Sequence, residues 1–427
     1  MKSRIDGLVQ DGGPPGRFLV ERSIFTDHDV FDREMAAIFE GGWVYLAHES
    51  QLPQPDDFVN VSLGRRSVIV ARGGDGVVRA FLNACPHRGS ALVRTAAGNR
   101  RMLTCPYHGW SFDSSGKNRL VKGRETGAYS EAFDAADVDL KALSHVQVYR
   151  GFVFGALANN VAPLDQHLGE AKFFIDLLVD QAPDGLEVVA GSAAYRFHGN
   201  WKLQVENGVD AYHFPVVHNN YVRILQQRQI RAQKSGIHDN VRTGFDQKAW
   251  GKEAGWHDLG QGHMLLWLVS AAPSDRPLWE QRDALAERVG PDRARWMVER
   301  QRNLSLFPNV QLMDQNSTQI RVIVPLAPDL TEVRSYCFAP RGEPAAAREK
   351  RVRQFEDFFN ASGFATPDDL AVFEQVQRGC ETAPEIRHGY DRGATRAGVQ
   401  KQGDDAQDET MYHGFYRRWL AAMQEGE

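Results

Sequence analysis

The sequence of 427 residues is poor in cysteine, has no surplus of positive charge and contains no long apolar run. Its four cysteines are too few for a disulfide-stapled scaffold. Because 50 Lys and Arg residues stand against 55 Asp and Glu, the formal net charge is −5, which argues against a nucleic-acid-binding surface. No run approaches the roughly 18 apolar residues of a membrane span, and residues 1–13 lack the apolar segment of a signal peptide. We therefore expect a cytoplasmic protein with reduced thiols and with neither nucleic-acid nor membrane partners.

Three segments with different patterns divide the chain. Residues 1–42 are expected to form an arm and a helix that pack with the larger domain. Residues 43–157 alternate short apolar runs with turn signals, which predicts a small antiparallel β domain. Residues 158–427 mix strand and helix patterns, which predicts a larger domain with an antiparallel sheet flanked by helices. The fold class is therefore predicted to be α+β.

Individual elements can be assigned within these segments. Strands of the larger domain are predicted over Leu186–Phe197, Gly262–Ser270, Val310–Leu312, Gln319–Leu326 and Glu332–Ala339. Helices are predicted over Thr26–Phe39, Trp201–His218, Pro344–Ser362, Pro367–Gln377 and Met411–Met423. Asp27 or Thr26 can cap the first of these helices, and Thr366 can cap the one that begins at Pro367.

One Cys and one His lie on each of two short arms in the β domain. Cys85 and His87 form the first arm, and Cys105 and His108 form the second. A zinc finger groups its ligands differently, with two Cys on one arm and two His on the other. The mixed arms suit a Rieske 2Fe–2S cluster, in which one iron takes two thiolates and the other takes two imidazoles. The alternative, four unrelated residues, would not explain this order and spacing.

The flanks of these arms also fit loops that close over a cluster. Pro86 and Pro106 stiffen the loops, and Gly89 and Gly109 are expected to allow close approach of the backbone. The other two cysteines, Cys337 and Cys380, have no such context, and we predict that they are buried thiols.

A second group of possible metal ligands lies in the larger domain. His213 and His218 are five residues apart, which an undistorted helix would place on different faces. Pro215 lies between them and is expected to kink the helix or open a bulge. Asp210 is three residues before His213 and could hydrogen-bond its ring as a supporting carboxylate.

A carboxylate is needed to complete the site. Asp368 and Asp369 begin a predicted helix, where acidic residues are also simply favourable for the helix dipole. Two imidazoles and one carboxylate on one side of an ion form the facial triad of non-haem Fe(II) oxygenases. The residues alone leave open which Asp is the ligand.

Together these residues resemble the catalytic α subunit of Rieske non-haem iron aromatic-ring-hydroxylating oxygenases, over nearly the whole chain. The resemblance is closest to the benzoate dioxygenase branch, which acts on benzoate, toluates, anthranilate and similar aromatic acids. The segments that carry it outside the metal motifs are Tyr45–Ser50, Gly199–Lys202, Glu206–Gly208, Gly262–Trp267 and Ala365–Asp369.

The resemblance implies a role for each matching residue. The cluster would be bound by the two Cys and two His of the β domain, and the mononuclear iron by His213, His218 and Asp369. Asp210 would couple the two centres, because in this family the cluster of one subunit lies close to the iron of its neighbour in an α3 ring. A small β subunit, giving α3β3, and an NADH-dependent reductase, possibly with a ferredoxin, are the implied partners.

The sequence departs from the benzoate branch beside the iron. The residue after Asp210 is Ala211 instead of Gly, the segment 214–217 is apolar, and Asn219 replaces Trp. These changes leave the iron ligands in place and bear on which substrate is bound.

The implied reaction adds both atoms of O2 to an aromatic ring as a cis-diol. The chain has no G-x-G-x-x-G after a strand and no second cysteine cluster, so electrons from NADH must come through a partner. Monohydroxylation, as in salicylate hydroxylases, is an alternative that the metal ligands do not separate. A Rieske electron carrier is disfavoured, because it would need only the β domain.

An aromatic carboxylate buried among apolar residues needs a cationic partner. Arg321 lies in a predicted strand between apolar residues, whereas Arg223 and Arg228 follow the iron-binding segment. We prefer Arg321, with an exposed edge arginine as the alternative reading of that position.

Overall fold

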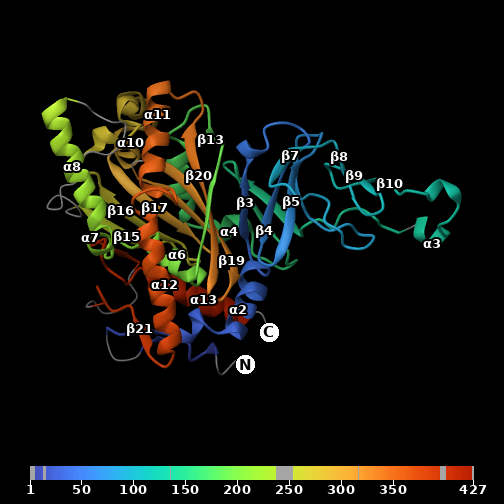
Figure 1. Cartoon of the computed structure of the whole chain (residues 1–427), viewed down its shortest axis with the longest axis horizontal. Helices are drawn as coiled ribbons and strands as arrows, with labels where there is room; N and C mark the ends of the chain where they lie inside the picture. Colours follow the sequence, from blue (N-terminus) through green and yellow to red (C-terminus); the bar gives the residue numbers. More distant parts are fainter. Residues whose placement is uncertain are drawn as a thin grey trace. The chain divides into compact units, whose positions relative to one another are not determined.

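A computed structural model describes residues 5–12, 16–134, 136–236, 253–315, 317–394 and 401–425. The chain forms two compact units (Figure 1). One contains the residues up to Ile38 together with those from Asp165 onward, and the other contains Phe39–Leu164.

The unit Phe39–Leu164 is built from short antiparallel strands. Its described residues form a four-stranded sheet in the order β6-β5-β4-β7 and two three-stranded sheets, β10-β9-β8 and β11-β12-β3. The strands are β3 (Val44–His48), β4 (Asp57–Leu63), β5 (Arg66–Arg72), β6 (Val78–Leu82), β7 (Ala97–Asn99), β8 (Met102–Thr104), β9 (Ser111–Asp113), β10 (Asn118–Leu120), β11 (His145–Tyr149) and β12 (Phe152–Ala156), and a short helix is α3 (Glu131–Asp134).

The apolar run of β5 is buried on both sides of its sheet. Val68 and Val70 pack into one core cluster, whereas Ile69 and Ala71 pack into another, because successive side chains of a strand point to opposite faces. The second cluster also contains Cys85 and Cys105. The strands therefore support the loops that carry the four predicted cluster ligands.

A large antiparallel sheet dominates the other unit. The strands follow the order β13-β20-β19-β18-β17-β16-β15-β22, and β14 also pairs with β20. These strands are β13 (Leu186–Val188), β14 (Ala193–Phe197), β15 (Ala254–Asp258), β16 (Met264–Val269), β17 (Arg300–Leu306), β18 (Val310–Asp314), β19 (Thr318–Ala327), β20 (Leu330–Pro340) and β22 (Gln402–Gly403). A small sheet is formed by β1 (Val9–Asp11), β2 (Phe18–Glu21) and β21 (Arg387–Gly389).

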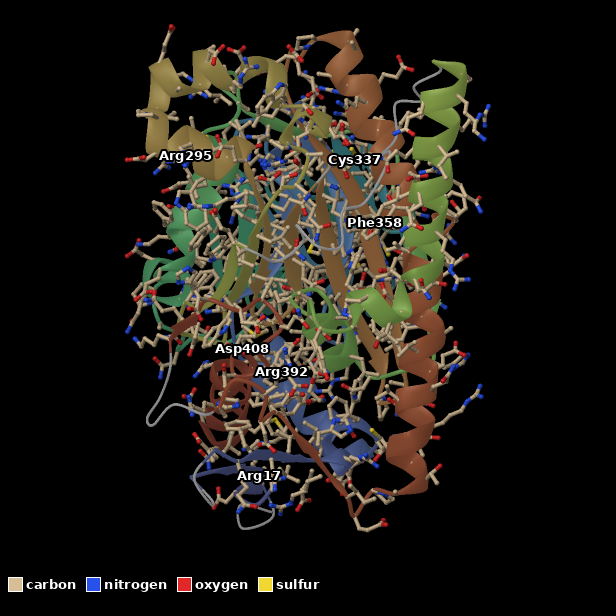
Figure 2. The ribbon with its side chains drawn as sticks, turned by 90° about the vertical axis from the view of Figure 1, so that its left-hand side faces the viewer. Arg17, Arg295, Cys337, Phe358, Arg392 and Asp408 are labelled. Atoms are coloured by element: carbon tan, nitrogen blue, oxygen red, sulfur yellow. The ribbon has the colours of Figure 1, made fainter. Side chains whose placement is uncertain are left out.

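Helices cover both faces of the large sheet. Figures 1 and 2 show α8, α11 and α12 on one face and α10 on the other, and Figure 2 shows Cys337 and Phe358 on the side of α8. The helices are α2 (His28–Glu34), α4 (Leu164–Leu168), α5 (Ala171–Val179), α6 (Trp201–Asn207), α7 (Phe214–Val217), α8 (Asn219–Ser235), α9 (Arg282–Val289), α10 (Pro291–Val298), α11 (Ala345–Gln354), α12 (Thr366–Thr382) and α13 (Tyr412–Glu425). The predicted α+β class is confirmed.

The helix predicted over Trp201–His218 is wrong as a single element. Helix α6 ends at Asn207, and a separate turn, α7, begins only at Phe214. Pro215 does not kink a helix: it lies in the first turn of α7, where its missing N–H costs nothing. The break lies upstream, over residues 208–213.

Other boundaries also differ from the sequence prediction. Asp27 does cap α2, because its side chain accepts from the backbone N–H groups of Asp29 and Val30. Thr366 is not a cap: its hydroxyl donates to the carbonyl of Phe359. The strand predicted over 186–197 is split into β13 and β14, and the helix predicted from Pro344 ends in a π-helical turn over Phe355–Phe359.

Helix α6 is anchored by a buried ion pair. Lys202 Nζ donates to Glu34 Oε1 at 2.5 Å, and both side chains are fully buried. The indole N–H groups of Trp201 and Trp419 also donate to the Glu34 carboxylate, at 2.8 and 2.7 Å. Because these residues come from α2, α6 and α13, distant parts of the chain fix the helix that precedes the segment with His213 and His218.

Candidate metal centres and substrate pocket

The two cluster arms adopt the same loop geometry. The N–H of Cys85 donates to the carbonyl of Ser90, and the N–H of Cys105 donates to the carbonyl of Trp110. In each loop the glycine N–H then donates back to the cysteine carbonyl, from Gly89 and Gly109 respectively. The loops follow β6 and β8, so short strands hold both arms.

The glycines of both loops adopt a backbone conformation that other residues rarely take. Gly89 has φ +75° and Gly109 has φ +76°, in the left-handed region that favours glycine. A Cβ added to Gly89 would meet no atom within 4 Å, and one added to Gly109 would meet only the Lys122 side chain, at 3.7 Å. The left-handed turn therefore explains both glycines, and the expected close approach of the backbone to the cluster stays a prediction.

The side chains of the two arms fit a cluster. The rings of His87 and His108 lie with centroids 4.6 Å apart, and His87 stacks on Trp110. In the described part of the protein, the Nδ1 atoms of both histidines are buried and have no hydrogen-bond partner. Unpaired buried nitrogens are costly, and the loops that carry them also carry two buried cysteines, which together fit a metal-binding role.

The surroundings shift the pKa values of the two thiols in opposite directions. Burial raises the pKa of Cys105, but the backbone N–H groups of Tyr107 and His108 outweigh it, so this pKa lies below its ordinary value. Burial keeps the pKa of Cys85 above its ordinary value. All four cysteines of the chain are buried and free of disulfides, as predicted for Cys337 and Cys380.

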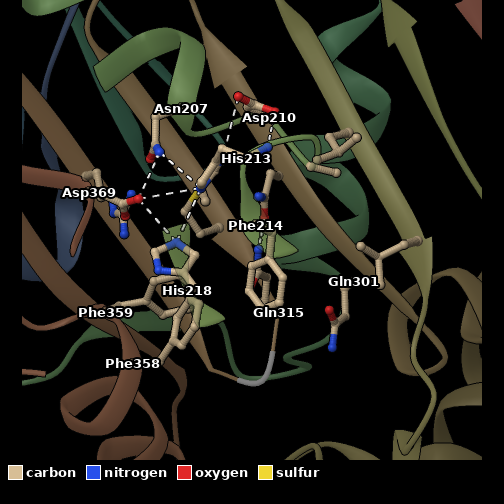
Figure 3. Close-up of a pocket in the computed structure, with 16 residues that line it drawn as sticks. Asn207, Asp210, His213, Phe214, His218, Gln301, Gln315, Phe358, Phe359 and Asp369 are labelled. Carbon is tan, nitrogen blue, oxygen red and sulfur yellow. Dashed lines mark hydrogen bonds and ion pairs between the residues drawn. The ribbon is translucent and has the colours of Figure 1, made fainter. Parts of the chain in front are cut away.

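His213 and His218 flank the single turn of α7. His213 precedes Phe214 at its start, and His218 follows Val217 and precedes α8. The two rings face one point, although an undistorted helix would place residues five apart on different faces. Asp369, in the first turn of α12, completes the group (Figure 3).

The three ligand atoms form a small triangle. The Nε2 atoms of His213 and His218 are 3.2 Å apart, and Oδ1 of Asp369 lies 3.4 and 3.1 Å from them. Two ligand atoms about 2.1 Å from an ion and at right angles are separated by about 3.0 Å. The triangle therefore fits three adjacent positions around one ion, as in a facial triad.

The electrostatics of the triangle also favour a cation. Burial lowers the pKa of His213, but the carboxylates of Asp210 and Asp369 outweigh it and raise this pKa to about 10. Burial raises the pKa of Asp369, but hydrogen bonds from His213 and His218 hold it well below its ordinary value. The carboxylates thus stabilise positive charge between the two rings.

The sequence analysis missed Asn207, which touches two members of the triangle. Its Nδ2 lies 3.2 Å from His213 Nε2 and donates to Asp369 Oδ1 at 3.1 Å (Figure 3). Asn207 is the last residue of α6, where an asparagine is not unusual. Only its neighbours in space therefore reveal the contact.

Each histidine of the triangle has a carboxylate near its other nitrogen. Asp210 Oδ2 lies 3.3 Å from Nδ1 of His213, and Asp368 Oδ2 lies 3.8 Å from Nδ1 of His218. The other oxygen of Asp210 accepts from the backbone N–H groups of Tyr212 and His213. Asp210 therefore lies in the loop between helices, not on a helix face as predicted, and its side chain is 28% exposed.

A pocket opens beside the triangle on one face of the large sheet. Its apolar lining consists of Ala211, Phe214, Leu266, Leu268, Met313, Phe358 and Phe359. Its uncharged polar lining away from the triangle consists of Gln301, Asn303 and Gln315. The pocket thus combines apolar side chains with a few polar groups, as is usual for sites that bind small molecules.

Arg321 also lines this pocket. It lies in β19, an inner strand, and is only 4% exposed, so it is not an exposed edge residue. Its guanidinium lies over the ring of Phe359, and in the described ranges it has no acidic partner. Arg228 instead makes two hydrogen bonds to Asp357, and Arg223 is exposed, so neither is a free cation in the pocket.

Comparisons with known families agree with this geometry. The family model for a Rieske [2Fe-2S] domain matches residues 42–134. The model for the ring hydroxylating alpha subunit (catalytic domain) matches residues 185–425. The chain therefore belongs to the ring-hydroxylating oxygenase α subunits, an oxidoreductase family with a 2Fe–2S cluster in the Rieske domain and a mononuclear iron in the catalytic domain. A lone Rieske carrier is excluded by the catalytic domain.

The similar proteins indicate the branch of the family to which this chain is most similar. The chain is 42% identical to the toluate 1,2-dioxygenase subunit alpha of Pseudomonas putida, over 98% of this chain and 94% of that protein. It is 43% identical to the anthranilate 1,2-dioxygenase large subunit of Acinetobacter baylyi, over 90% of this chain and 83% of that protein. A structure of naphthalene 1,2-dioxygenase with bound indole aligns with TM-score 0.82 and 27% identity, over 95% and 92% of the two chains. The predicted resemblance to the benzoate-like branch is confirmed.

No described helix has both the length and the apolar character that crossing a membrane requires.

Proposed function

We propose that this chain is the catalytic subunit of an oxygenase that converts a benzoate-type aromatic carboxylate to a cis-diol. The observation that carries the proposal is the buried Arg321 without an acidic partner in the described part of the pocket that also contains the iron triangle. The names of the toluate and anthranilate relatives support the same substrate class.

The proposed ligands follow from the two sites. Cys85, His87, Cys105 and His108 hold the cluster, and His213, His218 and Asp369 hold the iron. When bound, these centres supply the electron transfer and oxygen activation of the reaction. Consumption of one O2, two electrons and two protons per ring balances the formation of the diol.

The protein residues position the substrate. Arg321 pairs with the carboxylate, which would otherwise be costly to bury. Phe214, Phe358 and Phe359 then confine the ring beside the triangle. A carboxylate held in this way directs the reaction to the carboxyl-bearing carbon and its neighbour.

Electron delivery is assigned to partners. We propose that a separate reductase, which draws on NADH and in some arrangements uses a ferredoxin, reduces the cluster. An α3 ring, with or without a small β subunit, would bring the cluster of one subunit to Asp210 of the next. The partly exposed Asp210 carboxylate, which contacts His213 on one side, supports this coupling role.

The test of the carboxylate site is Arg321→Gln, which removes the charge and roughly keeps the length. We expect the apparent KM for benzoate-type acids to rise at least about tenfold, because a charge-assisted hydrogen bond pair is lost, with cluster and iron content unchanged. Arg223→Gln, on the exposed side of α8, is the matched control. Unchanged kinetics in Arg321→Gln on every acid, or equal activity of the parent enzyme on neutral aromatics, would contradict the proposal that Arg321 binds the substrate carboxylate.

A further inference from the structure

Resting on the proposed function, we infer that the pocket selects aromatic acids with a second substituent that donates a hydrogen bond, such as an amino or hydroxyl group. The residue that accepts this hydrogen bond is Gln315, which lines the same pocket as Arg321.

A chain of hydrogen bonds fixes which end of the Gln315 amide is free. The backbone carbonyl of Gly208 can only accept, so Asn303 must present its NH2 group there, at 2.8 Å. The Oδ1 atom of Asn303 then faces Gln315, whose own NH2 group donates to it at 2.9 Å. Within the described residues no donor reaches Oε1 of Gln315, which leaves this oxygen as an acceptor.

The position of Gln315 complements that of Arg321. Arg321 pairs in register with Gln311 of β18, and Gln315 lies four residues farther along the same chain segment. At about 3.4 Å per residue, the two backbone positions are separated by about 14 Å along the strand direction. Two long side chains that reach into the pocket from these positions can hold opposite ends of a substituted ring.

The surrounding residues sharpen the selectivity. The lining of the same pocket includes Leu266, Leu268 and Met313, whose side chains offer no hydrogen bond to a polar substituent. An amino or hydroxyl group beside them would lose its hydrogen bonds to water unless Gln315 replaced one. A methyl or chloro group gains nothing from this acceptor, and a nitro group, itself an acceptor, meets no donor at Oε1. Figure 3 shows Gln301 and Gln315 away from Asp369.

The experiment compares each aminobenzoate isomer with the toluate that has a methyl group at the same ring position. Amino and methyl groups are similar in size, so the pair isolates hydrogen bonding from fit. Dissociation constants are measured by calorimetry with the holoenzyme, for the parent, for Gln315→Met and for the control Gln226→Met on the exposed side of α8. Cluster absorbance and iron content establish that each variant is intact.

We expect at least one aminobenzoate to bind about tenfold more tightly than its toluate partner in the parent and in Gln226→Met. In Gln315→Met this ratio should fall to near one, with toluate binding unchanged within about twofold. Toluates that bind as well as or better than every aminobenzoate in the parent, or a ratio that survives Gln315→Met, would overturn the inference and leave the proposed function standing. Failure of all these acids to bind would overturn both.

Discussion

The triangle of His213, His218 and Asp369 brings together one atom from each of three side chains at mutual distances that suit a single ion. No two of them form a complete site, so each is expected to be essential for iron retention. Substitution of any one by Ala should remove about one iron per chain and abolish turnover. Metal analysis measures the iron lost per chain, with the cluster absorbance as the internal reference.

Asp368 provides the matched control for Asp369. Both residues follow the same loop, but Oδ2 of Asp368 lies 3.8 Å from Nδ1 of His218, outside the triangle. Asp368→Ala should therefore keep most of its iron. Loss of iron in Asp368→Ala together with retention in Asp369→Ala would reverse the ligand assignment.

Asp210 is expected to act on electron transfer rather than on iron binding. Its carboxylate contacts His213 from outside the triangle and remains partly exposed. Asp210→Asn should keep both metal centres and lower product formation by roughly 100-fold or more. Single-turnover kinetics on the reduced enzyme report cluster oxidation directly, and a normal oxidation rate in this variant would refute the coupling role.

Local patterns in the sequence were sufficient to propose the cluster ligands but not the whole iron site. Cys85, His87, Cys105 and His108 lie on two short arms, so their order alone indicates the chemistry. Asp369 is remote in sequence, and only the family resemblance distinguished it from Asp368. Asn207 and Gln315 could not be predicted, because their roles depend on hydrogen bonds between segments that the sequence does not connect.

The break between α6 and α7 directly precedes His213, a proposed iron ligand. Gly208 lies at the end of α6, where its carbonyl accepts from Asn303 and an added Cβ would overlap the amide of Gln311. Gly208→Ala should therefore displace the segment that carries His213. We expect a loss of about 1–3 kcal/mol in the free energy of unfolding, together with reduced iron content.

The control for this prediction is another glycine of the same unit. Gly379 lies within α12, and a Cβ added there meets no atom within 4 Å. Gly379→Ala should be neutral or stabilising, because Ala has the higher helix propensity. Thermal unfolding of the two variants compares them, and equal stabilities would show that the Gly208 site tolerates a side chain.

Sequence patterns predicted which segments are helical better than where they end. The prediction of a kink at Pro215 rested on a rule for helix interiors, but this proline starts a new turn. The hydrogen bond from Thr366 to Phe359 likewise replaces the expected cap, because the preceding π-helical turn brings that carbonyl within reach. Such boundaries depend on contacts between elements.

At the scale of the whole molecule, buried charge holds distant elements together. The fully buried pair of Lys202 and Glu34 joins α2 and α6, and Trp419 adds α13 through its indole N–H. These contacts stabilise α6, the helix that precedes His213. The α+β architecture could be predicted from alternating strand and helix patterns, whereas this network could not, because it joins residues from both ends of the sequence.

The measurement that tests the central claim most directly is turnover under 18O2 with benzoate-type acids, NADH and a compatible reductase, followed by mass spectrometry of the product. The account predicts a cis-diol that carries two 18O atoms, one on the carboxyl-bearing carbon and one on its neighbour. A product with a single 18O atom would make the enzyme a monohydroxylase. Efficient turnover of neutral aromatics with no reaction of any aromatic acid would contradict the proposed substrate class.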